Sequence, residues 1–597
     1  MPGITIAGGP NAQRALSTAA FDDYERRVFG AEGDGLRLGI TAYAAYPVVV
    51  TSGEWGVAVF EGAAYATPAA EIESTLGSLG RRFALEPAAV RADAERWAAG
   101  LDGDFAIAIV ARGGAGALVV NDRLGRLPLY WSSAGGNTVV AREIKAVRAG
   151  CGAGDVDRHA LAQTLLFSFP LGRRTLHAHI ARAGEASSIL VGAAGDVDVR
   201  QYYRWDFEAL ASEGGAKRDG GQAAALADRF VDRAGAIARW CADRPIVLGL
   251  SGGLDSRAVA AALARADVPY ACVTFSSRRK KSAEELDTSM QIARALGRSW
   301  EEYALETPSW IDARRMARLR DGSSNIALAF LFEYFAKLVA QFGPSVCHLT
   351  GDGGDRAMPD LRAGVPIRSR EGFLDYRLSE ALWRVDDVAR LVGLTRAAIV
   401  DVIRERFASY PERDAALLNV RFMIEEWAFA RLFGGEDRNR AFVWNATPFY
   451  CQSFFEAAMR VAQPAKRHYA LYAGFLRAID PRITSIAKSN WGYAVTSPLV
   501  RLHAWREALS TAASTSVKAL LPPRPAKAKR HRFGTDANDP EFAALARRHR
   551  SAAFETPALR ALADQGVDKL QFHMLATALL YIDDVWGDGP KEGAAGR

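Results

Sequence analysis

The sequence predicts two domains of different class: an α+β domain built on a sheet over residues 1–205, and an α/β domain with a doubly wound parallel sheet over residues 206–597. Two observations lead to this prediction. Short β-like runs separated by Gly-rich turns fill residues 36–145. From about residue 220, long amphipathic helices alternate with short apolar strands, which is typical of a parallel sheet covered by helices.

Composition and charge are those of a large globular protein with an ample core. Of the 597 residues, 49% are hydrophobic and 24% are charged, which excludes a disordered chain, a fibre and a small disulfide scaffold. The net charge of +7 is mild and diffuse, and the one concentrated basic run is residues 524–532. Because Pro-rich basic runs are usually solvated linkers, we expect no nucleic-acid partner.

Cysteine usage and the N-terminus indicate a soluble cytoplasmic protein. The cysteines are isolated and show no C-x-x-C spacing, so we expect neither a disulfide framework nor a zinc site. They are Cys151, Cys241, Cys272, Cys347 and Cys451. No charged region followed by an apolar run opens the chain, so we expect no export signal. The most apolar helical stretch, residues 326–340, is too short and too charged to span a bilayer, so we expect no membrane partner.

Strands interrupted by helices are expected in the first domain. One helical stretch, roughly Ala69–Ala98, lies among the predicted strands, and a second helix over Arg158–Phe167 leads into the last of them. The β-like runs are residues 41–50, 56–65, 105–114, 116–122, 137–144, 186–192 and 197–205.

In the second domain, a 3.6-residue periodicity predicts a helix over Gln222–Cys241, followed by a buried strand at 245–250. A Gly-rich turn then leads to a helix over 256–266 and a strand at 270–275. Because ligands bind at the carboxyl ends of the strands in a doubly wound sheet, we expect the functional residues in the turns that follow these strands.

The strongest functional signal is the turn after the first of these strands, LGLSGGLDSRAV over Leu248–Val259. Two adjacent glycines let backbone N–H groups approach an anion, and the N-terminus of the following helix favours negative charge. Asp255 would lie beside that anion, and a carboxylate next to a phosphate implies a bridging Mg²⁺. No Lys follows the glycines, which excludes a kinase-type P-loop. The spacing S-G-G-x-D-S instead resembles the pyrophosphate loop of ATP pyrophosphatases, which form acyl-adenylates.

A second acidic, Gly-rich turn lies about a hundred residues further along the chain. An apolar strand at 345–349 runs into TGDGGD, residues 350–355. We expect the carboxylates of this turn to lie next to the first turn. Asp255 and Asp355 from two separate loops would then suit a Mg²⁺ that holds pyrophosphate.

The pair SGGLDS and GDGGD resembles the synthetase domain of the asparagine synthetase family. Six further segments resemble parts of that family in the same order, and the resemblance spans roughly residues 36–500. It implies an Ntn-type, glutaminase-like domain followed by an ATP-pyrophosphatase (PP-loop) domain that uses ATP and Mg²⁺ to activate a carboxylate as its AMP ester. The segments are LDGDFAIAIV (101–110), NDRLGRLPLYW (121–131), AREIKAV (141–147), SAEELDTSMQIARALG (282–297), EDRNRAFVWNATPFYCQSF (436–454) and SIAKSNWGYAVTSP (485–498).

The chain departs from the family at the residue that a class II glutaminase uses as its nucleophile. The family reads M-C-G-I, whereas this chain reads Met1-Pro2-Gly3-Ile4, and no cysteine precedes Cys151. Proline has no thiol, so we expect the first domain to be a degenerate structural platform without glutaminase activity. The attacking amine must then come from elsewhere. The resemblance offers β-lactam synthetases and lasso peptide cyclases, in which an amine of the same molecule attacks.

Further departures favour the lasso peptide cyclases. Arg356 replaces the Glu that follows GxGxD in asparagine synthetases, and WNAT at residues 444–447 replaces a charged E-x-R segment. The second change predicts a roomier, more apolar wall for a peptide. β-Lactam synthetases have Tyr where this chain has Asp352. We therefore expect a macrolactam synthetase that joins an Asp or Glu side chain of a precursor peptide to the N-terminal amine. A β-lactam synthetase-like enzyme and an ammonia-dependent asparagine synthetase are the alternatives.

The resemblance assigns roles to particular residues. Asp352 is expected to position the amine or accept its proton, and Lys488 to neutralise the phosphates. Asp255 and Asp355 would bind Mg²⁺. A leader-peptide-binding protein and a leader protease are the implied partners. A non-catalytic scaffold is disfavoured because the motifs are complete, and a tRNA-modifying enzyme because zinc-ligand cysteines and an RNA module are missing. The residues expected to contact ATP are Leu250, Ser251, Gly252, Gly253, Leu254, Asp255, Ser256, Ser277 and Gly351.

Overall fold

The computed structural model describes residues 1–18, 21–30, 35–114, 116–213, 220–277, 283–500, 502, 540–549, 553–565 and 567–586. The predicted basic linker, residues 524–532, lies outside the described residues. Among the helices described, none combines the length and the apolarity that crossing a bilayer requires.

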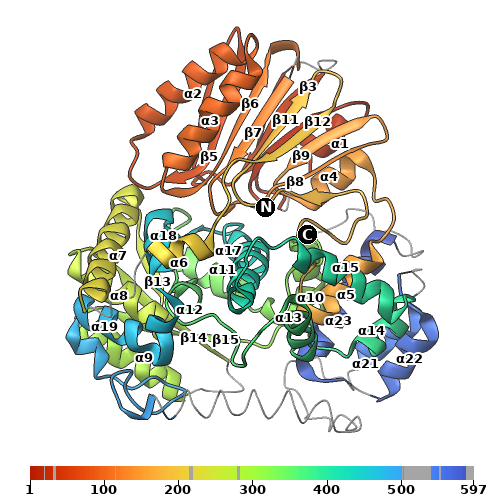
Figure 1. The fold of residues 1–597 in the computed structure, drawn as a ribbon. Coiled ribbons are helices and arrows are strands. Elements are labelled where there is room, and N and C mark those ends of the chain that lie inside the picture. The colour runs from red at the N-terminus through yellow and green to blue at the C-terminus, as the bar shows by residue number, and fades with distance from the viewer. Residues whose placement is uncertain are drawn as a thin grey trace.

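The first domain contains two antiparallel sheets (Figure 1). Their strands are β1 (Gly3–Gly8), β2 (Glu25–Phe29), β3 (Leu36–Ala42), β4 (Val48–Gly53), β5 (Gly56–Ala64), β6 (Gly103–Ala111), β7 (Gly116–Asn121), β8 (Tyr130–Ala134), β9 (Asn137–Ala141), β10 (Ala181–Arg182), β11 (Ser187–Gly192) and β12 (Val197–Gln201). One sheet has the order β10-β8-β9-β1-β3-β2 and the other β12-β11-β7-β6-β5-β4.

The two sheets pack face to face, and helices cover their outer sides. Alternating apolar residues such as Ile4, Leu38, Val59 and Val119 fill the space between the sheets. Helices α1 (Ala12–Leu16) and α4 (Ile144–Cys151) pack on the first sheet, and α2 (Ala69–Phe83) and α3 (Pro87–Gly100) on the second. The structure therefore confirms the predicted α+β domain, in which the two sheets and the helices outside them form four layers.

The structure refines the sequence prediction for this domain. The helical stretch expected over roughly Ala69–Ala98 is confirmed as two helices, because Pro87 opens α3 and cannot continue α2. The strand-like run 41–50 divides into β3 and β4 around Tyr43–Pro47. Strands β1 and β2 were not expected. The first is buried on both faces and the second is a charged edge strand, so neither shows the alternation that marks a half-buried strand.

The second domain is built on five parallel strands, which confirms the predicted doubly wound sheet. They are β13 (Ile246–Gly249), β14 (Ala271–Ser277), β15 (Trp300–Leu305), β16 (Cys347–Leu349) and β17 (Trp444–Ala446), in the order β15-β14-β13-β16-β17. Leu248 faces α7 (Gly220–Cys241), α8 (Asp255–Arg265) and α19 (Ala470–Ile479). Its neighbour Val247 faces the opposite side, where α11 (Leu331–Phe342) packs.

A separate group of helices has its own hydrophobic core beside this sheet. The helix predicted over Arg158–Phe167 is found as α5 with those bounds, and it packs here rather than on the sheets of the first domain. Its partners include α10 (Trp310–Leu319), α13 (Arg370–Ser379), α14 (Val385–Val392), α15 (Arg396–Ala408), α21 (Pro540–Arg548), α22 (Thr556–Gln565) and α23 (Lys569–Trp586). The shorter or connecting helices are α6 (Phe207–Glu213), α9 (Ala283–Ala295), α12 (Gly354–Ala357), α16 (Leu418–Arg421), α17 (Phe433–Asn439) and α18 (Gln452–Arg460).

Buried ion pairs join the two domains. Arg126 is fully buried; its Nε donates to Asp104 at 2.9 Å, and its Nη1 donates to Glu436 on α17 at 2.9 Å. Arg440 donates back to Asp104 at 2.8 Å. Removing one partner of a buried pair leaves an uncompensated charge at a cost of about 3–5 kcal/mol. These contacts therefore fix the position of α17 relative to the first domain.

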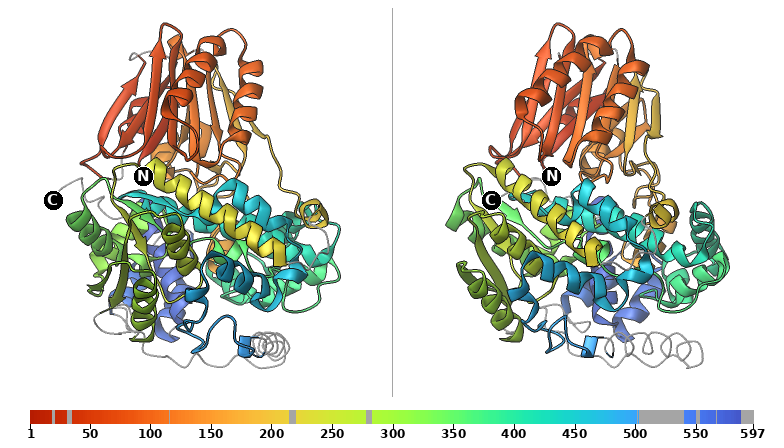
Figure 2. Two further views of the ribbon diagram at one scale, coloured as in Figure 1. Left: turned by 90° about the vertical axis from the view of Figure 1, so that its left-hand side faces the viewer. Right: turned by 60° about the vertical axis from the view of Figure 1, so that its left-hand side comes forward.

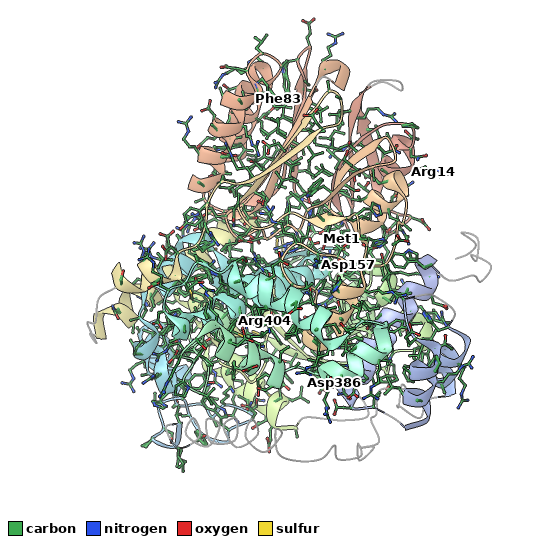
Figure 3. The ribbon with its side chains drawn as sticks, turned by 45° about the vertical axis from the view of Figure 1, so that its right-hand side comes forward. Met1, Arg14, Phe83, Asp157, Asp386 and Arg404 are labelled. Carbon is green, nitrogen blue, oxygen red and sulfur yellow. The ribbon has the colours of Figure 1, made fainter. Side chains whose placement is uncertain are left out.

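The views in Figure 2 show the first domain standing on the second, with α7 beneath the lower edge of its sheets. Arg233 on α7 lies 3.4 Å from Asp102, which precedes β6. In Figure 3, Met1 lies at this boundary between the two domains.

Candidate active site

The candidate active site lies where the strand order of the parallel sheet reverses. Strand β13 has β14, the next strand in the chain, on one side and β16 on the other. The turns after β13 and β16 therefore leave the same edge of the sheet from neighbouring strands. A crevice of this kind at the carboxyl ends of parallel strands is the usual ligand site of open α/β sheets.

The first turn is held in shape by its own hydroxyl groups. The Ser251 N–H donates to Ser256 Oγ at 3.0 Å, and the two seryl oxygens lie 2.9 Å apart. The Gly253 N–H points toward Ser251 Oγ at 3.3 Å. Thr274 on β14 donates to the carbonyl of Leu250 at 2.6 Å. Helix α8 then begins at Asp255, so its first N–H groups lie at this turn, as an anion site requires.

The second turn packs directly on the backbone of the first. A Cβ at Gly351 would lie 2.3 Å from the nitrogen of Ser256 and 2.6 Å from the carbonyl carbon of Asp255. A Cβ at Gly354 would lie 2.5 Å from Oδ1 of Asp255. Only glycine permits this approach, which brings the carboxylates of the two turns into one site.

Asp255 is half-buried and carries a perturbed charge. The hydroxyl of Tyr472 donates to its Oδ1. Its pKa is raised to about 7, first by burial and further by the negative charges of Asp355 and Asp352, while Lys488 acts in the opposite direction. Four of the sequence-predicted residues are therefore close enough to influence one another.

Asp352 has an exposed edge and lies next to the domain boundary, where the surrounding protein still desolvates its carboxylate. Its pKa is raised to about 7 by desolvation and by the nearby carboxylate of Glu436. Thr447 holds the loop by donating to the backbone carbonyl of Asp352 at 2.8 Å. Buried Arg438 faces Asp352, and burial lowers the pKa of Arg438 to about 10. Glu436 and Arg438 belong to segment 436–454, which resembles the synthetase family, but no role was predicted for either residue.

The residues present fit a Mg²⁺ shared with phosphate. Mg²⁺ usually takes one or two carboxylates from the protein and its other ligands from phosphates and water. Asp255 and the exposed Asp355 can supply such carboxylates, and their mutual repulsion is the condition a divalent cation relieves. In the described part of the chain there is no cluster of three or more His, Cys, Asp or Glu side chains arranged to hold a metal by themselves.

Lys488 lies in the loop that closes over the first turn. Its Nζ lies 4.2 Å from the centre of the Trp491 ring, and the next residue, Ser489, donates its N–H to the carbonyl of Gly252 at 3.3 Å. A cavity of about 470 Å³ separates residues 487–492 from α9. Ser277 is the exposed last residue of β14, at the same edge of the sheet.

Arg257 ties this loop to the first turn, and sequence reasoning missed it. Its side chain is completely buried and donates to the carbonyls of Ile483, Ile486 and Ala487 at 3.0, 2.6 and 3.0 Å, and to that of Gly253 at 3.2 Å. The one available signal was an arginine within an apolar, Ala-rich helix. Arg257 thus positions the segment that carries Lys488.

The predicted apolar wall at residues 444–447 is wrong. Trp444 is buried between Tyr46 and Trp240, with ring centres 5.8 and 5.5 Å away. The amide oxygen of Asn445 bonds His348 Nδ1 at 2.8 Å beneath the sheet. These side chains belong to the core because the first domain covers the edge strand β17.

An ion pair between Arg142 and Glu61 lies beside the start of β1 in the first domain. A Cβ at Gly3 would lie 2.5 Å from Cγ of Arg142 and 2.6 Å from Oε1 of Glu61. Arg142 and Glu61 are buried and paired, and Tyr46 donates to Glu61 at 2.6 Å. Charged side chains therefore fill the space beside the first residues of the chain.

An anion-binding turn at the switch point of a parallel sheet, with carboxylates from two strand ends, defines a nucleotide-binding α/β domain. Residues 234–371 match the asparagine synthase family, and residues 38–203 match the glutamine amidotransferase domain. The part of the chain that forms the antiparallel sheets is therefore similar to a glutamine amidotransferase domain, and the part that carries the two turns is similar to an asparagine synthase.

Individual relatives are distant. Asparagine synthetase [glutamine-hydrolyzing] 1 of Bacillus subtilis (strain 168) is 27% identical over 222 residues, which is 36% of this chain and 34% of that relative. The match thus spans about a third of the relative's length. Two solved structures overlap with this chain only at low TM-scores. The allosteric regulatory enzyme of purine biosynthesis gives 0.23, with 11% identity over 50% of this chain and 80% of the other. Glutamine phosphoribosylpyrophosphate amidotransferase from B. subtilis gives 0.24, with 9% identity over 69% and 94%.

Proposed function

We propose that the protein is an ATP-dependent, AMP-forming ligase that closes a macrolactam ring in a peptide, as lasso peptide cyclases do. The observation that carries the proposal is the contact between the two turns. Gly351 packs on Ser256, and the charges of Asp255, Asp352 and Asp355 meet beside Lys488. This arrangement suits the displacement of pyrophosphate from ATP by a carboxylate.

The proposed reaction has two steps. A side-chain carboxylate of an Asp or Glu in the peptide attacks the α phosphorus, the bond to the bridging oxygen breaks, and pyrophosphate leaves. The N-terminal α-amine then attacks the acyl carbon, loses a proton, and expels AMP. Bound Mg²⁺ would neutralise phosphate charge, held by Asp255 and Asp355. Lys488 would stabilise the negative charge that develops on the phosphates.

Asp352 is the proposed positioning group or base for the amine. An α-amine has a pKa near 7.7–8.0, so roughly a tenth to a sixth of it is already neutral at pH 7, and that fraction needs orientation more than a strong base. A carboxyl group with a pKa of about 7 is ionised in part at that pH and can accept the proton.

The amine is proposed to come from the substrate rather than from glutamine. Pro2 offers no thiol at the position of the family nucleophile, and the Arg142–Glu61 pair fills the space beside Gly3. The first domain would instead serve as a platform, because its buried Arg126 holds Glu436 of the second domain.

Two residues favour a peptide substrate. Asp352 is acidic where β-lactam synthetases have Tyr, and Arg356 replaces the Glu of asparagine synthetases. The proposed partners are a precursor peptide, a leader-peptide-binding protein and a leader protease. A β-lactam synthetase-like enzyme or an ammonia-dependent asparagine synthetase remains the alternative proposal, because each would use the same adenylation site.

The test is mass spectrometry of a peptide incubated with the full chain, ATP and Mg²⁺. The peptide carries a free N-terminal Gly and an Asp or Glu seven to nine residues in, as the lasso resemblance implies. We expect the loss of one water with matching AMP and pyrophosphate, abolished by Asp255→Ala and retained by Asp375→Ala, an exposed aspartate on α13. AMP formation with small β-amino acids but no peptide dehydration would favour β-lactam synthesis. AMP formation with aspartate and ammonia would favour asparagine synthesis.

A further inference from the structure

A cavity of about 380 Å³, which we call the basic cavity, lies between chain segment 171–204 and helix α15. None of the residues of the two active-site turns lines it. Five arginines and three glutamates do, so positive charge is in excess. They are Arg173, Arg174, Arg182, Arg204, Arg406, Glu185, Glu405 and Glu425.

Among the residues that the structure describes, three of these arginines form no ion pair with a carboxylate. Arg182 donates to two backbone carbonyls at 3.0 and 3.2 Å, and Arg204 donates to one at 3.1 Å. Within the residues that the structure describes, neither of them nor Arg173 forms an ion pair with a carboxylate. Arg406, by contrast, is neutralised by Glu425 and its neighbour Glu426. The cavity therefore presents guanidinium groups whose charge is left for a ligand.

The electrostatics of Arg173 agree with this geometry. Its pKa is lowered, first by partial burial and then by repulsion from Arg182 and Arg406, although Glu185 acts in the opposite direction. A bound anion would relieve this repulsion between like charges.

The basic cavity is connected to the candidate active site by one continuous helical wall. Glu425 lies on a π-helix over Phe422–Leu432, and the next part of that helix, including Arg431, lines a narrower cavity of about 60 Å³. Arg182 and Arg174 border both cavities. The π-helix runs into α17, which carries Glu436 beside Asp352. π-Helical turns are frequent at functional sites.

We propose that the basic cavity binds an acidic segment of the peptide substrate, whose carboxylates pair with Arg173, Arg182 and Arg204. This inference rests on the proposed function, because it takes the ligand of the cavity to be the peptide that the candidate active site activates. The cavity has room for several groups, its cationic side chains are spread around it, and it adjoins the wall that leads to Asp352. An extended chain with several carboxylates matches these properties better than a single small anion.

The test measures peptide binding without ATP, so that it does not depend on chemistry. A fluorescent peptide with a free N-terminal Gly, an Asp seven to nine residues in and a run of Glu after it is titrated with the full chain by fluorescence polarisation. A second peptide has Gln in place of each Glu of the run. The variant is Arg173→Glu with Arg204→Glu, both on exposed side chains. The matched control is Arg14→Glu, an exposed arginine on α1 of the first domain (Figure 3).

We expect the Glu peptide to bind about tenfold more tightly than the Gln peptide at low salt, and the difference to shrink as salt rises. The double variant should lose about tenfold in affinity for the Glu peptide, and Arg14→Glu should not.

Equal binding of the two peptides, an unchanged double variant, or binding of an RNA oligonucleotide in place of the peptide would overturn the inference. Failure of the proposed function gives a different pattern: the Glu peptide binds as expected, but ATP yields neither AMP nor dehydration. If the double variant cyclises the Glu peptide as efficiently as the wild type does, the function stands and the inference is wrong.

Discussion

The contact between the two active-site turns predicts that Gly351→Ala disables adenylation without unfolding the protein. The added Cβ would lie 2.3 Å from the nitrogen of Ser256 and 2.6 Å from the carbonyl carbon of Asp255. Non-bonded carbon and nitrogen atoms need roughly 3.4 Å, so the turns must separate by about 1 Å. Neither contact atom can move alone, because both belong to the backbone at the start of α8. Overpacking of this size costs about 1–3 kcal/mol, and a 1 Å displacement of reacting groups costs about 100-fold in rate.

The assay is AMP formation by the full chain with ATP, Mg²⁺ and the peptide, together with the thermal midpoint. We expect Gly351→Ala to lower the rate about 100-fold and the midpoint by a few degrees. Gly100→Ala is the control, because the same Cβ at that helix end meets nothing within 4 Å. A Gly351→Ala protein with normal AMP formation would refute the reasoning, since the two turns could then separate without losing function. An unfolded variant would equally refute it, because only the site should be disturbed.

Two further predictions concern buried side chains around the site. Arg257→Lys keeps the charge but cannot reach the separate carbonyls that the guanidinium joins, so it should destabilise the fold by about 3 kcal/mol and slow AMP formation. Arg265→Lys, in the last turn of the same helix, should change neither the free energy of unfolding nor the rate of AMP formation. If the two variants behave alike, Arg257 does not hold segment 483–487 in place as argued. Burial lowers the pKa of His348 from its ordinary value of 6.5 to about 4 in the folded protein. Between these two pH values the unfolded state binds more protons than the folded state, so the free energy of unfolding falls as the pH drops from 6.5 to 4. In His348→Gln, the fall in the free energy of unfolding between pH 6.5 and 4, measured by urea unfolding, should be smaller by about 3 kcal/mol. His159→Gln should follow the wild type. If the free energy of unfolding of all three proteins depends on pH in the same way, the prediction is wrong.

Local motifs predicted the fold class and the centre of the site because each turn carries its information within a few residues. A strand, a pair of glycines, an aspartate and a helix start are all readable at Leu250–Ser256, and the structure brings this turn to residues 351–355. The role of Arg257 was not readable. It depends on segment 483–487, which is distant in sequence and packs on α8 only in the folded chain.

The error at Trp444 has the same origin. An aromatic residue beside small ones was read as the wall of a pocket, but β17 is the edge of the sheet, and the first domain covers that edge with Tyr46. An interpretation of the motif within its own domain could not take Tyr46 into account, because Tyr46 lies about four hundred residues earlier in the chain. The basic cavity was missed for a similar reason, since its arginines come from segments on both sides of residue 206.

The charge network at the boundary gives the first domain a role that does not require a nucleophile. Arg126 binds Glu436, and Glu436 in turn raises the pKa of Asp352. A guanidinium that neutralises Glu436 limits how far that carboxylate can suppress the ionisation of Asp352. The first domain therefore contributes to the electrostatics of the candidate active site through a buried ion pair. This contribution does not depend on a thiol nucleophile, which gives a physical reason for the two domains to be joined in one chain.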